Sequence, residues 1–209
     1  MTQPLRVIDL GRMPYAEAYE LQQQHLAEVL ADRAARVEGG NPEGEHASAD
    51  GGRRLFVEHE PVVTVSKRAS APAHLIDLEY LFALAGVAIE PTDRGGDVTY
   101  HGPGQLVAYP IIDLNRYRLN LHAYMRLLEQ TVIDTLSGFG LEGWRDDSAT
   151  GVWVGEKPGA KIAAMGVRVR RWVSMHGLAL NVDPDMNHFD LIVPCGLAGR
   201  NVTSLKREL

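Results

Sequence analysis

A glycine-rich stretch, residues 94–105, constrains the fold of this chain more than any other part of it. It contains four glycines: a pair directly after an arginine, and two in a Gly-Pro-Gly after a histidine. Glycine is required where the backbone takes a positive φ or where another group approaches it closely. Between the glycines, residues 97–100 alternate in polarity, which predicts a short strand with Val98 and Tyr100 on one face.

The side chains of this stretch indicate more than a turn. A plain hairpin corner does not require Arg94, Tyr100 and His101 together. Polar side chains on a loop held by a rigid scaffold are typical of binding sites. We therefore interpret the stretch as a ligand-binding loop, with a simple corner as the alternative.

The pattern around this loop predicts an α+β (mixed α/β) fold, with a mixed β-sheet and flanking helices. Residues 106–112 are apolar on both faces, as expected of a buried central strand. Further strands are predicted at 5–10, 55–58, 62–65, 87–89, 151–154, 161–170 and 172–182, and helices at 15–36, 78–85 and 121–136, the last two capped by Asp77 and Asn120. The elements do not alternate as regular βαβ units, which argues against a doubly wound sheet.

The length and composition indicate one domain, residues 1–209, with an ordinary core. Hydrophobic residues make up 45% of the 209 residues and charged residues 23%. A glycine-rich segment at about 38–53 is expected to be a flexible loop within this domain.

The net charge of −6 argues against a nucleic-acid-binding protein, which usually carries a surplus of basic residues. An acidic protein partner would require a local basic patch to overcome the overall repulsion. Arg168, Arg170 and Arg171 could form one such patch, and Lys206 and Arg207 another.

Cysteine and histidine usage restricts the chemistry. The single cysteine cannot form an intramolecular disulfide, which fits a reducing compartment, and it excludes a zinc site built on several cysteines. The histidines at 59, 101, 122 and 176 are scattered in the sequence, so we expect hydrogen-bonded imidazoles rather than metal ligands. The N-terminus has no apolar signal core and no window has the length of a membrane span, so the expected location is the cytoplasm.

Cys195 is the first candidate for a catalytic residue. It follows Pro194, which cannot join a β-ladder, and precedes Gly196, so the thiol is expected at the end of a strand. A buried, inert thiol is the alternative.

Lys161 is the second candidate. Simple strand alternation places it on one face with Ala163, Met165, Val167 and Val169, and a lysine on an apolar face is unusual. Desolvation favours the neutral amine, which can act as a base. The alternative is a strand-end lysine whose amine reaches water.

Small residues leave room for an alkyl chain beside the predicted sheet. They are Gly95, Gly96, Ala163, Ala164, Gly166, Gly177 and Ala179. Burial of each CH₂ contributes about 0.8 kcal/mol, so an eight-carbon acyl chain could gain roughly 5 kcal/mol. There is no Gly-x-Ser-x-Gly elbow, P-loop, Gly-x-Gly-x-x-Gly or His-Glu-x-x-His motif.

Four blocks together resemble the octanoyltransferases of lipoate biosynthesis, the lipoyl(octanoyl) transferase family. The family pattern Arg-Gly-Gly-x-x-Thr-x-His-Gly-Pro-Gly-Gln matches residues 94–105, and Lys-Ile-Ala before small-x-Gly matches 161–166. His-Gly-x-Ala-x-Asn matches 176–181, and Pro-Cys-Gly matches 194–196. The resemblance covers most of residues 55–205, and four blocks in order are highly specific.

The resemblance implies a biotin/lipoate protein ligase-like fold and a transfer of octanoyl through an acyl-cysteine thioester. It assigns the nucleophile to Cys195, and to Lys161 the lowering of the cysteine pKa and acid/base catalysis. The implied substrate-binding residues are Arg94, Gly95, Gly96, Asp97, Val98, Thr99, Tyr100, His101, Ala164, Met165, Gly166, Gly177, Leu178 and Ala179.

The resemblance also implies partners. The donor would be octanoyl-acyl carrier protein, and the acceptors lipoyl domains of 2-oxoacid dehydrogenase E2 subunits and the glycine cleavage H protein. No cofactor, metal, nucleic acid or membrane is implied, and a monomer is expected. Two features depart from the family: the segment 39–52 is long, and the chain ends soon after Leu205.

Three other functions remain open at this point. An ATP-dependent lipoate or biotin-type protein ligase would share the fold and use Lys161, but would need no thiol. A non-catalytic acyl- or lipoyl-binding protein would need neither Lys161 nor Cys195. A cysteine hydrolase would pair Cys195 with a histidine such as His101.

Overall fold

The computed structural model describes residues 5–38, 52–67, 86–192 and 200–209. Three sequence predictions lie outside these residues: the helix at 78–85 with its Asp77 cap, most of the loop at 38–53, and Cys195 with its two neighbours. Among the described helices, none is both long and apolar enough to cross a bilayer.

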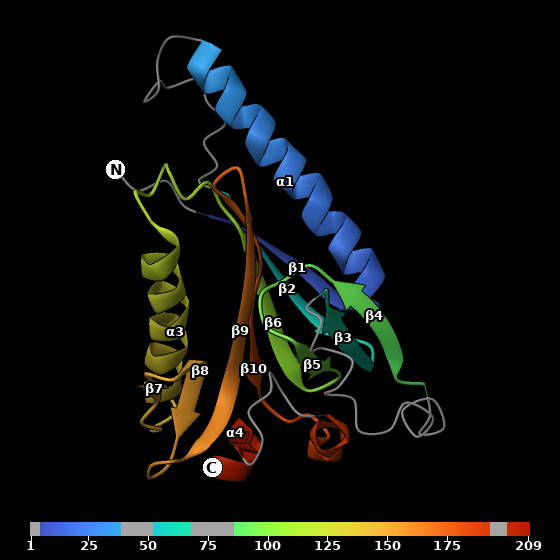
Figure 1. The fold of residues 1–209 in the computed structure, drawn as a ribbon, viewed down its shortest axis with the longest axis vertical. Helices are drawn as coiled ribbons and strands as arrows, with labels where there is room; N and C mark the ends of the chain where they lie inside the picture. Colours follow the sequence, from blue (N-terminus) through green and yellow to red (C-terminus); the bar gives the residue numbers. More distant parts are fainter. Residues whose placement is uncertain (1–4, 39–51, 68–85, 193–199) are drawn as a thin grey trace.

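The centre of the molecule is a mixed sheet (Figure 1). Its strands lie in the order β1 (Arg6–Met13), β2 (Arg53–His59), β6 (Gln105–Ile111), β10 (Val173–Asn181), β9 (Ala160–Arg170), β8 (Ala149–Val154) and β7 (Trp144–Asp146), and β11 (Asn201–Val202) also pairs with β9. β1 is parallel to β2 and β11 to β9, whereas the other pairs are antiparallel. The predicted class is confirmed.

A second, smaller sheet was not predicted. It has the order β4 (Ala88–Thr92), β3 (Val62–Ser66) and β5 (Val98–His101). The strands β2 and β3 are close in sequence, but β2 already pairs with β1 on one side and β6 on the other. Because a strand has only two edges, β3 cannot pair with β2. It pairs instead with β4 and β5, and β5 carries part of the glycine-rich stretch into this second sheet.

Two helices cover opposite faces of the main sheet (Figure 1). The helix α1 (Tyr15–Glu38) packs on β1, β2, β6 and β10, and α3 (Leu121–Ser137) packs on β8, β9 and β10. Both were predicted, and Asn120 caps α3 by accepting a hydrogen bond from the Ala123 N–H at 2.8 Å. A 3₁₀ turn, η2 (Met186–Leu191), and a short helix, α4 (Leu205–Glu208), were not predicted.

The predicted central strand is buried on both faces along most of its length. Five residues of β6 after Leu106 are buried, as expected from their apolar run. Leu106 itself is exposed. The sheet therefore has one apolar core under α1 and another under α3, and β6 and β10 contribute to both.

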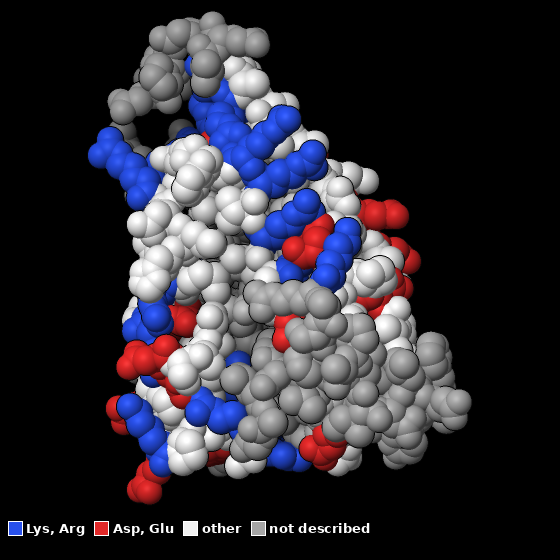
Figure 2. All heavy atoms as spheres, viewed as in Figure 1, with Lys and Arg blue, Asp and Glu red and all other residues white. Residues whose placement is uncertain are grey.

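Basic side chains gather over the C-terminal half of α1 and the turn between β9 and β10, in the upper part of Figure 2. Arg170 and Arg171 are exposed there, and Arg33 of α1 donates a hydrogen bond to the Arg171 carbonyl at 2.7 Å. The other predicted patch is weaker, because Lys206 pairs with Asp183 at 2.8 Å.

Candidate active site

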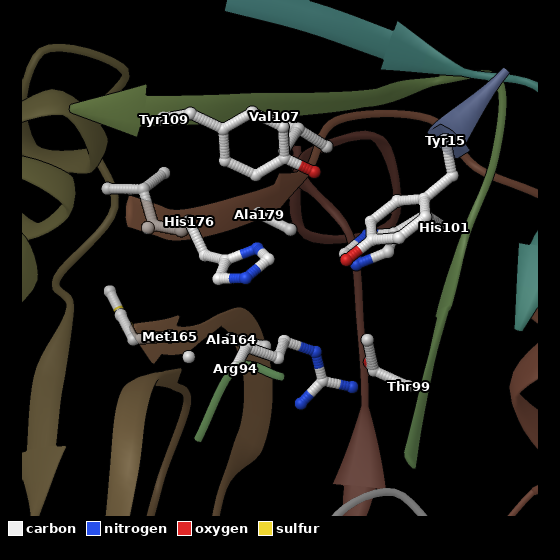
Figure 3. Close-up of a pocket in the computed structure, with 13 residues that line it drawn as sticks. Tyr15, Arg94, Thr99, His101, Val107, Tyr109, Ala164, Met165, His176 and Ala179 are labelled. Atoms are coloured by element: carbon white, nitrogen blue, oxygen red, sulfur yellow. The ribbon is translucent and has the colours of Figure 1, made fainter. Parts of the chain in front are cut away.

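A cavity lies between the main sheet, the small sheet and the start of α1 (Figure 3). Most of its wall comes from β9, β10 and β6, and the rest from the glycine-rich stretch and one tyrosine of α1. It is lined by Tyr15, Arg94, Thr99, His101, Val107, Tyr109, Ala164, Met165, Gly166, His176, Gly177, Leu178 and Ala179. Three of the four sequence blocks thus meet at one place.

Paired glycines bring the loop of Arg94 onto β9. The Gly95 N–H donates to the Val167 carbonyl at 3.0 Å, and Gly96 has a φ of +92°. A Cβ on Gly166 would lie 2.7 Å from the Gly95 oxygen, so only a glycine at 166 permits this approach. The Arg94 guanidinium then points into the cavity (Figure 3) and donates to the Gly95 carbonyl at 2.9 Å and to Thr64 Oγ1 at 3.0 Å.

Strand alternation in β5 sorts the neighbouring side chains. Thr99 and His101 face the cavity, whereas Val98 and Tyr100 lie together in a separate apolar cluster, as the alternation predicted. The Tyr100 hydroxyl lies 2.8 Å from His188 Nδ1. Burial, with a smaller contribution from Asp185, raises the pKa of Tyr100 to about 12.

Three histidines that are distant in sequence gather at the cavity, and all three are hydrogen-bonded, as expected. His101 and His176 line it, and the His59 and His101 ring centroids lie 5.7 Å apart. The fourth histidine named from the sequence, His122 on α3, is exposed and does not line either cavity. The topology explains the clustering, because β2, β5 and β10 all end or pass beside the same cavity.

The pKa values of all three imidazoles are lowered, which favours their neutral forms. Burial lowers the pKa of His59 to about 4 and that of His101 well below its usual range. Burial, followed by the positive charges of Arg94 and Arg168, lowers the pKa of His176 to about 3.

The partners of each ring indicate which nitrogen carries the proton. His176 donates from Nε2 to Asp93 Oδ1 at 2.8 Å, because a carboxylate can only accept. His59 donates from Nδ1 to the Met13 carbonyl at 3.3 Å and accepts at Nε2 from the Tyr109 hydroxyl at 2.7 Å.

His101 belongs to a chain of side chains that leads toward Lys161. The Gln105 amide nitrogen donates to Asn181 Oδ1 at 2.9 Å, so the amide oxygen of Gln105 faces His101. This Oε1 accepts a hydrogen bond from His101 Nδ1 at 3.0 Å. The Asn181 amide donates to the Thr203 carbonyl at 2.9 Å, and the Thr203 N–H donates to the Lys161 carbonyl at 2.9 Å. The last residues of two sequence blocks, Gln105 and Asn181, therefore tie the sheets together.

A second cavity adjoins the first and contains Lys161. It is lined by Thr99, Gln105, Lys161, Ala164, Ala179, Asn181, Phe189 and Val202. Thr99, Ala164 and Ala179 line both cavities, so the two share a wall. Lys161 is 8% exposed, and its Nζ donates to the Thr150 carbonyl at 3.1 Å.

The prediction that Lys161 shares a strand face with Ala163 and Met165 is wrong. The pairing of β8 with β9 shifts register, so that Val152 faces Ala163 but Trp153 faces Lys161. The extra residue in β9 breaks the alternation. As a result Ala163 and Met165 pack in the core under α3, whereas Lys161 lines a cavity with Ala164.

The predicted substrate-binding residues divide into two groups. Nine line the first cavity: Arg94, Thr99, His101, Ala164, Met165, Gly166, Gly177, Leu178 and Ala179. Gly95, Gly96, Asp97, Val98 and Tyr100 line neither cavity and shape the loop or the core behind it. Lys161 lines the second cavity, and Cys195 lies outside the described residues.

Several lining residues were missed. His176 and Asn181 belong to a recognised sequence block, so their position in it was an available signal. Tyr15 and Tyr109 carried no such signal, because an aromatic residue in a helix or strand usually belongs to the core. Within the described ranges, no group of three or more His, Cys, Asp or Glu side chains could hold a metal ion.

Known proteins with similar sequences share one activity in their names. The family model Lipoyl protein ligase A/B catalytic domain matches residues 14–209. An octanoyltransferase of Flavobacterium johnsoniae is 43% identical, covering 100% of this chain and 88% of the relative. An octanoyltransferase of Solibacter usitatus is 47% identical, covering 94% of this chain and 80% of the relative.

Solved structures show the same fold at low identity. A bipartite lipoate protein ligase of Thermoplasma acidophilum has a TM-score of 0.69 at 16% identity, covering 98% of this chain and 76% of the other. A lipoate-protein ligase A bound with ATP has a TM-score of 0.66 at 17% identity, covering 97% and 76%. The sequence match over nearly the whole length and the shared fold agree, and this chain belongs to the lipoyl protein ligase A/B catalytic domain family.

Proposed function

We propose that this protein is an octanoyltransferase that carries an octanoyl group from octanoyl-acyl carrier protein to a lysine of lipoyl domains, the first step of endogenous protein lipoylation. The acceptors are the lipoyl domains of 2-oxoacid dehydrogenase E2 subunits and the glycine cleavage H protein. The relatives named octanoyltransferase support the acyl transfer.

The adjoining cavities are the observation that carries this proposal. The first offers alkyl and bare backbone surface from Ala164, Met165, Gly177 and Leu178, and the second presents the amine of Lys161. An acyl chain in the first cavity would place its carbonyl near the second. Burial of such a chain contributes roughly 5 kcal/mol to binding, which is enough to hold the octanoyl group but still allows it to be released to the acceptor.

The proposed nucleophile is Cys195, with Lys161 as its acid/base partner. Two described residues that flank Cys195 in sequence, Phe189 and Val202, both line the cavity of Lys161. A cation beside a thiol lowers the pKa of the thiol, so a charged Lys161 would favour the reactive thiolate.

The transfer balances in two steps. In the first, the proton of Cys195 passes to Lys161, which leaves an ammonium beside a thiolate. The thiolate sulfur then bonds to the octanoyl carbon, and the carbon–sulfur bond to the carrier breaks. Lys161 returns the proton to the carrier thiol. In the second, the acceptor lysine amine bonds to the same carbon and gives up a proton to Lys161, while the acyl-cysteine bond breaks and the sulfur of Cys195 leaves as a thiolate. An amide forms without ATP, and the ammonium–thiolate pair is restored.

Intact-mass spectrometry after incubation with octanoyl-acyl carrier protein tests the first step. We expect one octanoyl adduct on the protein, none on a Cys195→Ala variant, and loss of the adduct when a lipoyl domain is added. A full adduct on Cys195→Ala would refute the acyl-cysteine intermediate.

The same assay separates the transferase from the alternatives. An ATP requirement with free octanoate as donor would indicate a ligase. Release of free octanoate without an acceptor would indicate a hydrolase, and octanoyl binding without any covalent product would indicate a binding protein.

A further inference from the structure

The side chain of Lys161 lies in a slot formed by the neighbouring strand β8. Trp153 faces it directly in the strand pairing, and the Lys161 Nζ lies 4.6 Å from the centroid of the Trp153 ring. The carbonyl of Thr150, at the other end of the same strand segment, accepts a hydrogen bond from this Nζ at 3.1 Å.

Gly151 leaves the space that the lysine side chain occupies. Its φ is +140°, a conformation that side chains rarely adopt. A Cβ there would lie 3.1 Å from Lys161 Cε, 3.2 Å from the Trp153 ring and 2.8 Å from the Ala163 oxygen. The glycine thus permits the lysine to lie against the indole.

Within the part of the chain that the structure describes, the indole N–H of Trp153 forms no hydrogen bond. The residue is fully buried, and its Nε1–H has no hydrogen-bond partner there. An unsatisfied buried donor is unfavourable, and a phenylalanine would avoid it. What an indole offers beyond a phenyl ring is a stronger attraction for a cation over its face.

The charged groups around this slot are already paired. The Arg200 guanidinium lies 5.6 Å from the same ring centroid and forms an ion pair with Asp146. Glu129 of α3 accepts from the Gly151 N–H at 3.3 Å and pairs with Arg126 at 2.7 Å and Arg145 at 3.2 Å. Among the described residues of β8, the Thr150 carbonyl and the Trp153 ring face contact Lys161 Nζ, and both favour the charged form of Lys161.

We propose that Trp153 is a positioning residue that, with the Thr150 carbonyl and Gly151, holds Lys161 as an ammonium at the edge of the second cavity. The inference rests on the proposed function, in which this ammonium favours the thiolate of Cys195. Trp153 lines neither cavity, so it acts through Lys161 and not on the substrate.

Alkylation of the thiol provides a test that is independent of octanoyl transfer. The chain has one cysteine, so the rate of iodoacetamide labelling as a function of pH reports that thiol alone. Removing the ring face in Trp153→Leu is expected to slow labelling at pH 7 roughly five- to tenfold and to move its midpoint to higher pH. Trp153→Phe should give an intermediate rate.

Trp144→Phe is the matched control. Trp144 stacks on Trp153 at 6.0 Å and lies under the exposed Lys157 at 5.1 Å, so it makes the same kind of contact with a different lysine. Its replacement should leave the labelling profile unchanged.

Fluorinated tryptophan separates the electronic effect from packing. In a Trp144→Phe, Trp172→Phe background, 5-fluorotryptophan is incorporated only at position 153 and weakens the ring's attraction for a cation with little change in shape. Labelling should slow about two- to threefold, in the direction of Trp153→Leu. This variant also decides the question if Trp153→Leu does not fold.

Lys161→Met distinguishes failure of the inference from failure of the proposed function. If Lys161→Met slows labelling but the fluorinated protein labels at the unmodified rate, the role of Trp153 is refuted and the Lys161–Cys195 pair stands. If Lys161→Met labels like the unmodified protein, the pair itself, and the inference with it, is refuted.

Discussion

At the scale of single residues, Asp93 joins three side chains that come from different elements. It accepts from the His176 ring at 2.8 Å and the Tyr19 hydroxyl at 2.6 Å, and it pairs with Arg168. A carboxylate is suited to this position because it only accepts, and all three partners donate. Asp93 thereby fixes the ring of His176 in the cavity wall.

Asp93→Asn is expected to lower the free energy of unfolding by roughly 1–3 kcal/mol and to raise KM for the octanoyl donor. The amide keeps one acceptor but turns a donor toward Arg168 or Tyr19, so a buried polar group loses its partner. Urea denaturation and steady-state kinetics measure the two effects. The matched control is Asp183→Asn, whose exposed pair with Lys206 should contribute less than about 0.5 kcal/mol, and equal losses in the two variants would contradict this role.

The residues also show where sequence reasoning reaches its limit. The blocks around Arg94, Lys161 and His176 were recognised because their glycines and polar groups stand out among apolar neighbours. Trp153 and Gly151 were assigned only to a strand. Their relation to Lys161 depends on a register shift between β8 and β9, which neither strand's own sequence reveals.

At the scale of elements, the contact between the Arg94 loop and β9 holds the small sheet against the large one. It depends on the backbone hydrogen bond from Gly95 to Val167 and on the absence of a side chain at Gly166. The first cavity lies directly beside this contact, so its shape depends on how closely the two segments approach.

Gly166→Ala is expected to destabilise the protein by roughly 1–3 kcal/mol and to raise KM for the octanoyl donor, because the added methyl displaces Gly95 and Arg94. Thermal unfolding and donor titration measure these effects. Val167→Ala is the control, since that side chain packs toward α3 and its loss should lower stability without changing KM. A Gly166→Ala enzyme with an unaltered KM would show that the loop position does not shape the substrate site.

The elements themselves were largely predictable, and their grouping was not. The helices α1 and α3 and most strands follow from apolar periodicity, caps and glycine stops. The division into two sheets involves the pairing of β2 with β1 and β6, which leaves β3 no edge of its neighbour in sequence, and this pairing is a property of the assembled sheet. The three histidines are similarly far apart in sequence and meet only through the strand order.

At the scale of the whole molecule, the buried histidines link stability to pH. Burial lowers the pKa of His59 to about 4, and burial together with the charges of Arg94 and Arg168 lowers that of His176 to about 3, so the folded protein favours the neutral rings. In the unfolded chain a histidine takes up a proton below about pH 6.5. The stabilisation is therefore fully present above pH 6.5 and is lost as the pH falls toward 4.

Urea unfolding between pH 7.5 and 4.5 should show this loss, with each such histidine contributing about 1.4 kcal/mol per pH unit below 6.5. His59→Gln should reduce the slope of the free energy of unfolding against pH by the contribution of one histidine, even if the variant is less stable at pH 7.5. The exposed His122 provides the control, and His122→Gln should leave the slope unchanged. A slope that is identical in all three proteins would contradict the assignment of buried neutral rings.

The strand β9 carries Lys161 near its start and the cavity residues Ala164, Met165 and Gly166 in succession after it. Successive residues advance about 3.3 Å along a strand. Under the proposed function, an acyl chain whose carbonyl lies beside this amine would extend past these residues, and chains of different length would end opposite different residues of β9.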